Sequence, residues 1–195
     1  MVLLTLLSIV QALALELLWS QVRESGYLLV MTWDAMLSWI QIVTSFFGIV
    51  VIWIVYASAA MRFRWVPTTG DSIYPFIIGL LEFILIEALE PRFTGWWFMC
   101  LAMIFGLMTW INHSTMRRAR LDGENDEFFA NLAPATNRDF YATYTIVAVF
   151  TLAGIYLAAS GDRGLFALIA TVAAAAVLVR QLIVSTRFWE ISVSN

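Results

Sequence analysis

Residues 31–59 read MTWDAMLSWIQIVTSFFGIVVIWIVYASA, and this stretch contains a single charged side chain, that of Asp34. A helix needs about 20 apolar residues to cross the roughly 30 Å hydrocarbon core of a bilayer. The stretch is long enough, so it predicts a membrane-spanning helix. Apolar runs of similar character lie on both sides of it. The predicted spans are residues 2–19, 31–59, 72–89, 95–111, 141–159 and 165–184.

The composition supports the same fold class. The chain of 195 residues is 62% hydrophobic and 13% charged, whereas a typical soluble domain is roughly 45–50% apolar and about 25% charged. So few charged side chains cannot cover the surface of a soluble domain. We therefore expect an all-α, polytopic integral membrane protein, with about six transmembrane helices in one bundle and residues 1–195 forming a single domain.

The connection at 113–139 is the only long one between the predicted spans. It contains a basic run at 117–120 and then an acidic run at 122–127. We expect the fourth helix to extend into this connection, to break at Gly123, and to be followed by a short surface helix near 124–132.

The arginines predict the orientation in the membrane. All 11 basic residues are arginines. With six spans, one side of the membrane carries Arg62, Arg64, Arg117, Arg118, Arg120, Arg138, Arg180 and Arg187, and the other carries Arg23, Arg92 and Arg163. The positive-inside rule places the arginine-rich side, and with it both termini, in the cytoplasm. The expected location is a cell membrane of the bacterial inner-membrane type, with the lipid bilayer as partner.

The first apolar run could also be a signal peptide. Residues 1–14 have no basic residue at their start and are short for such a peptide. We therefore expect this run to remain as a span.

Missing residue types exclude several chemistries. Without lysine the chain cannot form a retinal-type Schiff base or a Walker phosphate loop. Cys100 and His113 are the only residues of their kinds, so no intrachain disulfide, typical zinc site or pair of axial haem histidines can form. The net charge of −3 does not favour nucleic acid. We expect no cofactor and no metal.

Four polar residues and one glycine in the second span repeat at helical spacing. Asp34, Ser38, Gln41, Ser45 and Gly48 follow one another at intervals of 4, 3, 4 and 3 residues. These intervals place them on one face of a helix. We expect this stripe to face the interior of the bundle.

Acidic side chains lie inside or at the ends of the apolar runs, where charge is costly. Glu16 and Glu87 are expected near the outer ends of their spans, together with Asp34 and Glu90, where they could line an acidic vestibule. Gln11 and Glu82 would lie deeper. The candidate residues of an ion or proton pathway are Gln11, Glu16, Asp34, Gln41, Glu82 and Glu87.

Structural roles are the alternative for the same residues. A carboxyl group in a membrane helix often carries a proton and is hydrogen-bonded to a neighbouring helix, where it stabilises packing. Asp34 also fits a helix cap at the interface. Both interpretations stay open at this stage.

The basic run has a less specific interpretation. Arg117, Arg118 and Arg120 fit contacts with lipid headgroups or with a protein partner. His113 suits the C-terminal end of a helix, where a positive charge is favourable.

Small residues predict close helix contacts. Gly154 and Ala158 in the fifth span, and Ala170 and Ala174 in the sixth, have the spacing at which helix backbones approach each other.

Six spans in about 200 residues resemble the layout of the bacterial relatives of the lysosomal potassium channel, which assemble as oligomers. Their first helix carries an arginine followed shortly by Phe-Ser-Asp, whereas residues 8–16 here read SIVQALALE. No pore residue is therefore carried over, and the resemblance implies only a possible homo-oligomer.

Three functions are compatible with these features. The first is a membrane scaffold or accessory subunit that docks a protein partner through the cytoplasmic loop 113–139. The second is a small cation or proton channel or transporter that uses the acidic residues of the first and third spans. An intramembrane enzyme comes third, because no catalytic constellation or GxSxG motif is present.

Overall fold

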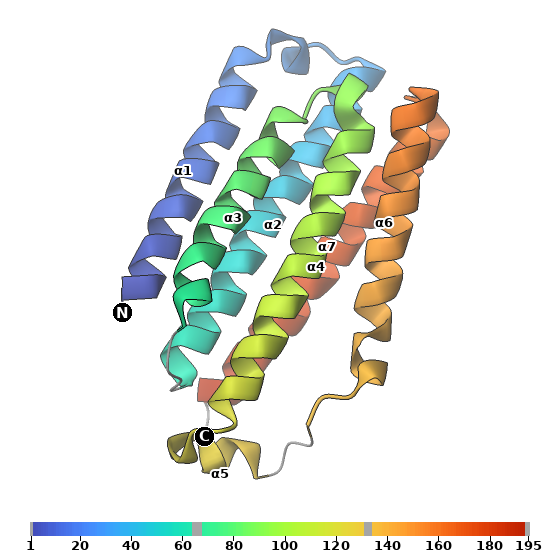
Figure 1. Ribbon diagram of the computed structural model, residues 1–195. Coiled ribbons are helices and arrows are strands. Elements are labelled where there is room, and N and C mark those ends of the chain that lie inside the picture. The colour runs from blue at the N-terminus through green and yellow to red at the C-terminus, as the bar shows by residue number, and fades with distance from the viewer. Residues whose placement is uncertain (1, 64–67, 131–133, 194–195) are drawn as a thin grey trace.

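The computed structural model describes residues 2–63, 68–130 and 134–193, and these residues fold into helices joined by short connections (Figure 1). Six of the helices are long and apolar enough to cross a membrane. The helices are α1 (Val2–Glu24), α2 (Trp33–Arg62), α3 (Thr69–Glu87), α4 (Thr94–Ala119), α5 (Asp126–Phe129), α6 (Tyr141–Ser160) and α7 (Leu165–Val193), with short 3-10 turns at Gly26–Leu29, Pro91–Phe93, Gly123–Asn125 and Asn137–Phe140.

The six long helices run alternately up and down in one bundle (Figure 1). The start of α1, the end of α7 and the short helix α5 lie at the same end of the bundle. We call this the α5 end, and we call the opposite end, where α1 turns into α2 and α6 turns into α7, the far end. Because the number of long helices is even, the start of α1 and the end of α7 lie at the same end of the bundle.

The predicted spans are confirmed as helices, and most helices extend beyond them. α2 continues to Arg62, α4 to Ala119 and α7 to Val193, because hydrogen-bonded helix persists past the apolar run until a breaker or a loop ends it. The predicted surface helix is shorter than expected: α5 ends at Phe129. Residues 131–133, at the end of that prediction, and Arg64 lie outside the described residues.

Three helix pairs build the bundle: α4 packs along α6, α2 along α7 and α1 along α3. A Cβ atom on Gly95 would lie 2.4 Å from the backbone nitrogen of Ala158, and one on Gly154 would lie 2.9 Å from the carbonyl oxygen of Gly95. The backbones of α4 and α6 are therefore in direct contact, which confirms the close contact predicted from Gly154 and Ala158.

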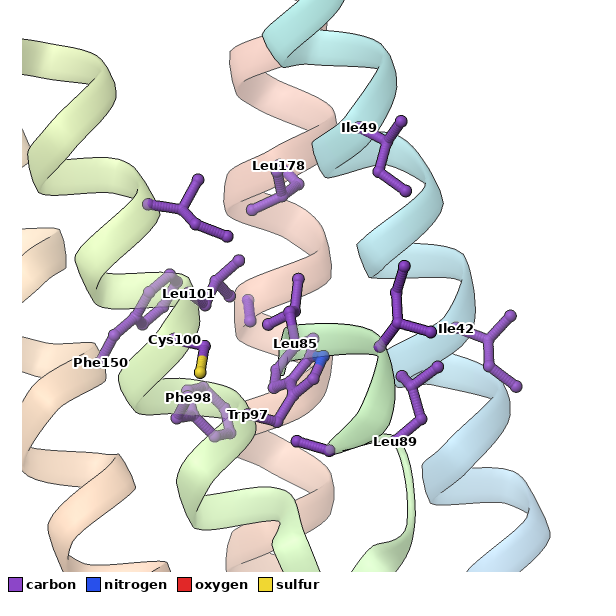
Figure 2. Packing of buried hydrophobic residues seen from close by; sticks show 14 of the residues in the cluster. Ile42, Ile49, Leu85, Leu89, Trp97, Phe98, Cys100, Leu101, Phe150 and Leu178 are labelled. Atoms are coloured by element: carbon purple, nitrogen blue, oxygen red, sulfur yellow. The ribbon is translucent and has the colours of Figure 1, made fainter. Parts of the chain in front are cut away.

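The core lies among the six long helices, and large side chains fill it (Figure 2). Trp97 and Phe98 of α4 are fully buried, with ring centroids 5.0 Å apart. Phe98 in turn packs edge-on against Phe150 of α6 at 5.6 Å. These aromatic contacts join the α4–α6 pair to the centre of the bundle.

A separate aromatic cluster fixes α5 beneath the bundle. The ring of Phe63, just after α2, lies 4.9 Å from the ring of Phe128 and 5.6 Å from that of Phe129. The side chain of Asn125 donates a hydrogen bond of 2.7 Å to the carbonyl oxygen of Ala119. The first half of the loop 113–139 is therefore packed against the helices.

Candidate functional site

A buried pair of polar side chains joins α1 to α3. The Nε2 atom of Gln11 donates a hydrogen bond of 2.9 Å to Oε2 of Glu82. Gln11 is 4% exposed and Glu82 is 1% exposed. The second oxygen of the Glu82 carboxyl group, Oε1, is buried and has no hydrogen-bond partner, and the same is true of Oε1 of Gln11.

Glycine brings these two side chains together. A Cβ atom on Gly79 would lie 2.3 Å from Cγ1 of Val10, so only glycine allows α1 to approach α3 this closely. Val10 directly precedes Gln11, and Gly79 lies one helical turn before Glu82. The close contact therefore places the amide beside the carboxyl group.

No positive charge accompanies this pair in the described part of the chain: no arginine lies within ion-pair distance of Glu82. A buried carboxylate without a positive partner is costly. A proton or a bound cation would offset that cost.

The polar stripe on α2 faces the bundle interior, as predicted. Ser38, Gln41 and Ser45 are fully buried. Ser45 accepts a hydrogen bond of 3.0 Å from Nε1 of Trp97. The amide of Gln41 has no hydrogen-bond partner on either its nitrogen or its oxygen.

Ser38 belongs to a chain of hydrogen bonds at the far end. The hydroxyl of Tyr27 donates to Ser38 at 3.0 Å, and Ser38 donates to the carbonyl oxygen of Leu89 at 3.1 Å. The hydroxyl groups of Tyr27 and Ser38 are therefore both hydrogen-bonded at this end.

A cavity of about 230 Å³ extends from Glu82 toward the α5 end. It begins beside Glu82 and Ser45, and it extends to Asn112, Asp139 and Gln181 toward the α5 end. Apolar side chains of the five surrounding helices, α2, α3, α4, α6 and α7, line its middle section: Ile49, Ile52, Val55, Leu85, Leu101, Ile104, Phe105, Met108, Ile146 and Leu178.

The length of the cavity follows from the helices that line it. Its lining on α4 runs from Leu101 to Asn112, and on α2 from Ser45 to Val55. At 1.5 Å per residue these segments are about 16 Å and about 15 Å long. α6 and α7 have few contacts with each other, since α6 packs on α4 and α7 on α2. This separation leaves space for the cavity between the two pairs.

A larger cavity of about 630 Å³ adjoins the first at the α5 end, and Val55, Asn112 and Gln181 line both. His113, Arg117 and Arg120 also line this larger cavity. The larger cavity thus places polar and basic side chains next to the cavity that Glu82 lines.

Asp34 occupies a different setting from the one predicted. Its carboxylate lies 3.7 Å from the guanidinium of Arg163, and the two side chains are 45% and 49% exposed. The packing of α7 along α2 brings the turn before α7 to the start of α2, so a basic residue does reach this layer. The predicted capping role of Asp34 is wrong, because the side chain of Thr32 accepts the capping hydrogen bond from the backbone nitrogen of Ala35.

The other acidic candidates are not brought to the buried pair. Glu16 and Glu87 are exposed on the outside of α1 and α3. Glu90 forms an ion pair of 2.6 Å with Arg92. None of these three residues lines the cavity that reaches Glu82.

The three arginines after the fourth span have two different surroundings: Arg118 contacts α3, whereas Arg117 and Arg120 line the larger cavity. Arg118 forms an ion pair of 2.6 Å with Asp71 and donates a hydrogen bond of 2.9 Å to the hydroxyl of Thr68, so it joins α4 to the start of α3. Arg117 is exposed, and Arg120 lies with its guanidinium carbon 4.5 Å from the ring centroid of Phe129.

Asn112, Asp139 and Gln181 were missed as site residues. Gln181 is a polar residue inside the predicted span 165–184, which is the same signal that identified Gln11 and Gln41. Asn112 and Asp139 flank the long connection, and nothing in their local sequence marks them as cavity residues.

The geometry defines a bundle of long apolar helices that contains a buried amide–carboxyl pair, and the carboxyl residue of this pair lines a cavity. Within the described residues, no three His, Cys, Asp or Glu side chains gather where they could hold a metal ion. Comparison with protein-family models, curated proteins and solved structures found no match to this chain.

Proposed function

We propose that this chain is a multi-pass membrane protein that translocates protons, with Glu82 as the proton-binding group. One observation carries the proposal: Glu82, whose buried carboxyl group has one oxygen without a partner, lines a cavity that extends toward one end of the bundle. Burying an ionisable carboxyl group at this depth costs free energy, and such groups commonly mark proton or ion pathways in membrane proteins.

The orientation supports a cytoplasmic entrance. The α5 end carries the arginine-rich connections of the chain, and the far end carries Arg23, Arg92 and Arg163. By the positive-inside rule the α5 end faces the cytoplasm. Protons would therefore reach Glu82 from the cytoplasmic side in this conformation.

The depth of Glu82 fits a proton pathway. Glu82 lies 13 residues after Thr69, the first residue of α3, which is about 20 Å along the helix axis. A cavity about 16 Å long covers about half of a 30 Å hydrocarbon core. The distance left to the far end is short enough for a modest rearrangement to open.

The set of ligands favours a proton over a metal cation. Ca²⁺ requires six to eight oxygen ligands, and Mg²⁺ requires near-octahedral coordination. Glu82 is hydrogen-bonded to the amide of Gln11, and Ser45, which carries a hydroxyl group, lines the same cavity as Glu82. A single proton needs only the free carboxyl oxygen.

The test is proton flux in liposomes that contain the purified protein and an internal pH-sensitive dye. We expect the wild-type protein to dissipate an imposed pH gradient. Glu82→Gln, which keeps the shape and removes the exchangeable proton, is expected to lower the flux by at least about tenfold. Glu87→Gln is the matched control, because it removes an exposed carboxyl group from the same helix.

Three results would reject the proposal. They are the absence of flux in the wild type, a flux that Glu82→Gln leaves unchanged, and an equal loss in Glu87→Gln. Flux of Na⁺ or K⁺ without protons would assign Glu82 to a cation pathway in place of a proton pathway.

Docking of a protein partner through the loop 113–139 is a second candidate. The observation that favours it is the fixed position of α5, which presents exposed Asp126 and Glu127 while Phe129 is buried beneath it. This candidate predicts a co-purifying protein that Asp126→Arg with Glu127→Arg removes. Exposed Glu24 at the far end gives the matched control, Glu24→Arg, which should leave the partner bound.

A further inference from the structure

We infer that the larger cavity at the α5 end binds an anionic phospholipid, with the phosphate at its basic rim and an acyl chain along its apolar wall. The inference rests on the proposed membrane location of the bundle. It does not require proton translocation at Glu82.

The rim of this cavity has the chemistry of an anion site. Arg117, Arg120 and His113 line the cavity, and no carboxylate is among the described residues that line it. Arginine suits phosphate because its planar guanidinium group can donate two parallel hydrogen bonds.

Two contacts hold basic side chains in place at the rim. The guanidinium of Arg120 lies over the ring of Phe129, which orients the planar group. The ring of His113 packs edge-on against Phe140, with centroids 4.9 Å apart. Side chains held in this way lose less entropy when an anion binds.

The wall of the cavity is mostly apolar, which a soluble anion would not use. Its apolar lining comes from α2, α4, α5 and α7 and from the connection after α5, and consists of Val55, Ala59, Met116, Phe128, Phe129, Pro134, Ala135 and Val184. The cavity volume of about 630 Å³ is in the range of sites that enclose much of a small-molecule ligand. A basic rim above an apolar wall fits a ligand with an anionic head and a hydrocarbon chain.

The location also fits a lipid. The cavity lies at the end of the long helices, where basic residues in membrane proteins meet headgroups. Basic pockets between membrane helices on the cytoplasmic side are a known way to bind anionic lipid heads. The expected ligand therefore comes from the cytoplasmic leaflet.

The experiment measures lipid binding to the purified full chain in detergent by native mass spectrometry. The probes are phosphatidylglycerol, zwitterionic phosphatidylcholine with the same acyl chains, and glycerol phosphate without acyl chains. We expect phosphatidylglycerol to bind at least about tenfold more tightly than either of the others.

Variants locate the site. Arg117→Gln with Arg120→Gln is expected to remove the preference for phosphatidylglycerol over phosphatidylcholine. Arg138→Gln is the matched control, because Arg138 is an exposed arginine of the same end that does not line the cavity. Val184→Trp, at a half-exposed position on the apolar wall, is expected to weaken both lipids and so tests the acyl-chain part separately.

Each contrary outcome has one meaning. Equal binding of the two lipids, or an equal loss in Arg138→Gln, would overturn the inference by showing unspecific attraction. Binding of glycerol phosphate as tight as that of phosphatidylglycerol would overturn the lipid assignment in favour of a soluble phosphate ligand. Proton flux through Glu82→Gln liposomes is a different readout, so failure of the proposed function is seen independently.

Discussion

The two ends of the bundle differ in where their polar side chains lie. At the far end, Tyr27, Ser38 and the carbonyl oxygen of Leu89 form a hydrogen-bonded chain, and Trp97 donates to Ser45. At the α5 end, Asn112 and Gln181 line cavities. Glu82 lies between the two regions. The proposed proton pathway therefore predicts that protons reach Glu82 from the α5 end and not from the far end.

Thiol labelling tests this difference most severely, because the expected result is close to all-or-none. In a Cys100→Ala background, Thr109→Cys places a thiol on the cavity lining and Ser38→Cys places one in the far-end hydrogen-bonded chain. A water-soluble maleimide added at the α5 end is expected to label the first and to leave the second unlabelled. Mass spectrometry of the intact protein measures the labelling.

The opposite labelling pattern would show that the cavity opens at the far end. Cys100 is buried, at 3% exposure, and its replacement removes any background reaction.

Backbone contact between α4 and α6 gives the largest expected effect on stability. Gly95→Ala would place a methyl group 2.4 Å from the backbone of Ala158, which cannot move independently of its helix. We expect a loss of about 3 kcal/mol in the free energy of unfolding. Thermal unfolding in detergent micelles measures it.

Gly106 of the same helix provides the control. A Cβ atom there meets nothing within 4 Å, and alanine favours helix over glycine by about 0.5–1 kcal/mol. Gly106→Ala should therefore leave stability unchanged or raise it. A similar loss in both variants would mean that helix flexibility, and not the α4–α6 contact, explains the result.

Ion pairs at the two ends should differ in strength. Arg118 and Asp71 at the α5 end are 25% and 4% exposed and 2.6 Å apart, whereas Arg163 and Asp34 at the far end are about half exposed and 3.7 Å apart. Removing one partner of a buried pair leaves an uncompensated charge. Arg118→Gln should thus cost about 2 kcal/mol, and Arg163→Gln less than about 1 kcal/mol.

Chemical denaturation of the two variants in mixed micelles separates these values. Equal losses would contradict the assignment of Arg118 to a structural bridge. Rescue of Arg118→Gln by Asp71→Asn, which removes the orphaned charge, would support it.

The sequence was sufficient for features that depend on one helix at a time. Length and hydropathy predicted the long helices, and the spacing from Ser38 to Ser45 predicted the buried face of α2. Periodicity within a segment carries this information, since burial of one face repeats with the helical turn.

Features that depend on which helices pair could not be read in the same way. The hydrogen bond between Gln11 and Glu82 requires α1 to lie against α3, and that contact depends on Gly79 meeting Val10. Asp34 meets Arg163 only because α7 packs along α2. A single sequence contains the residues of these contacts and does not show which of them are partners.

Infrared spectroscopy of the protein in liposomes tests the central claim most directly, because it detects the carbonyl stretch of a protonated carboxyl group. If Glu82 exchanges its proton through the cavity, the wild type and Glu87→Gln should show a protonated-carboxyl band that disappears when the solution at the α5 end is made alkaline. Glu82→Gln should lack that band. The account is contradicted if the band persists in Glu82→Gln, or if it does not respond to the pH at the α5 end in the wild type.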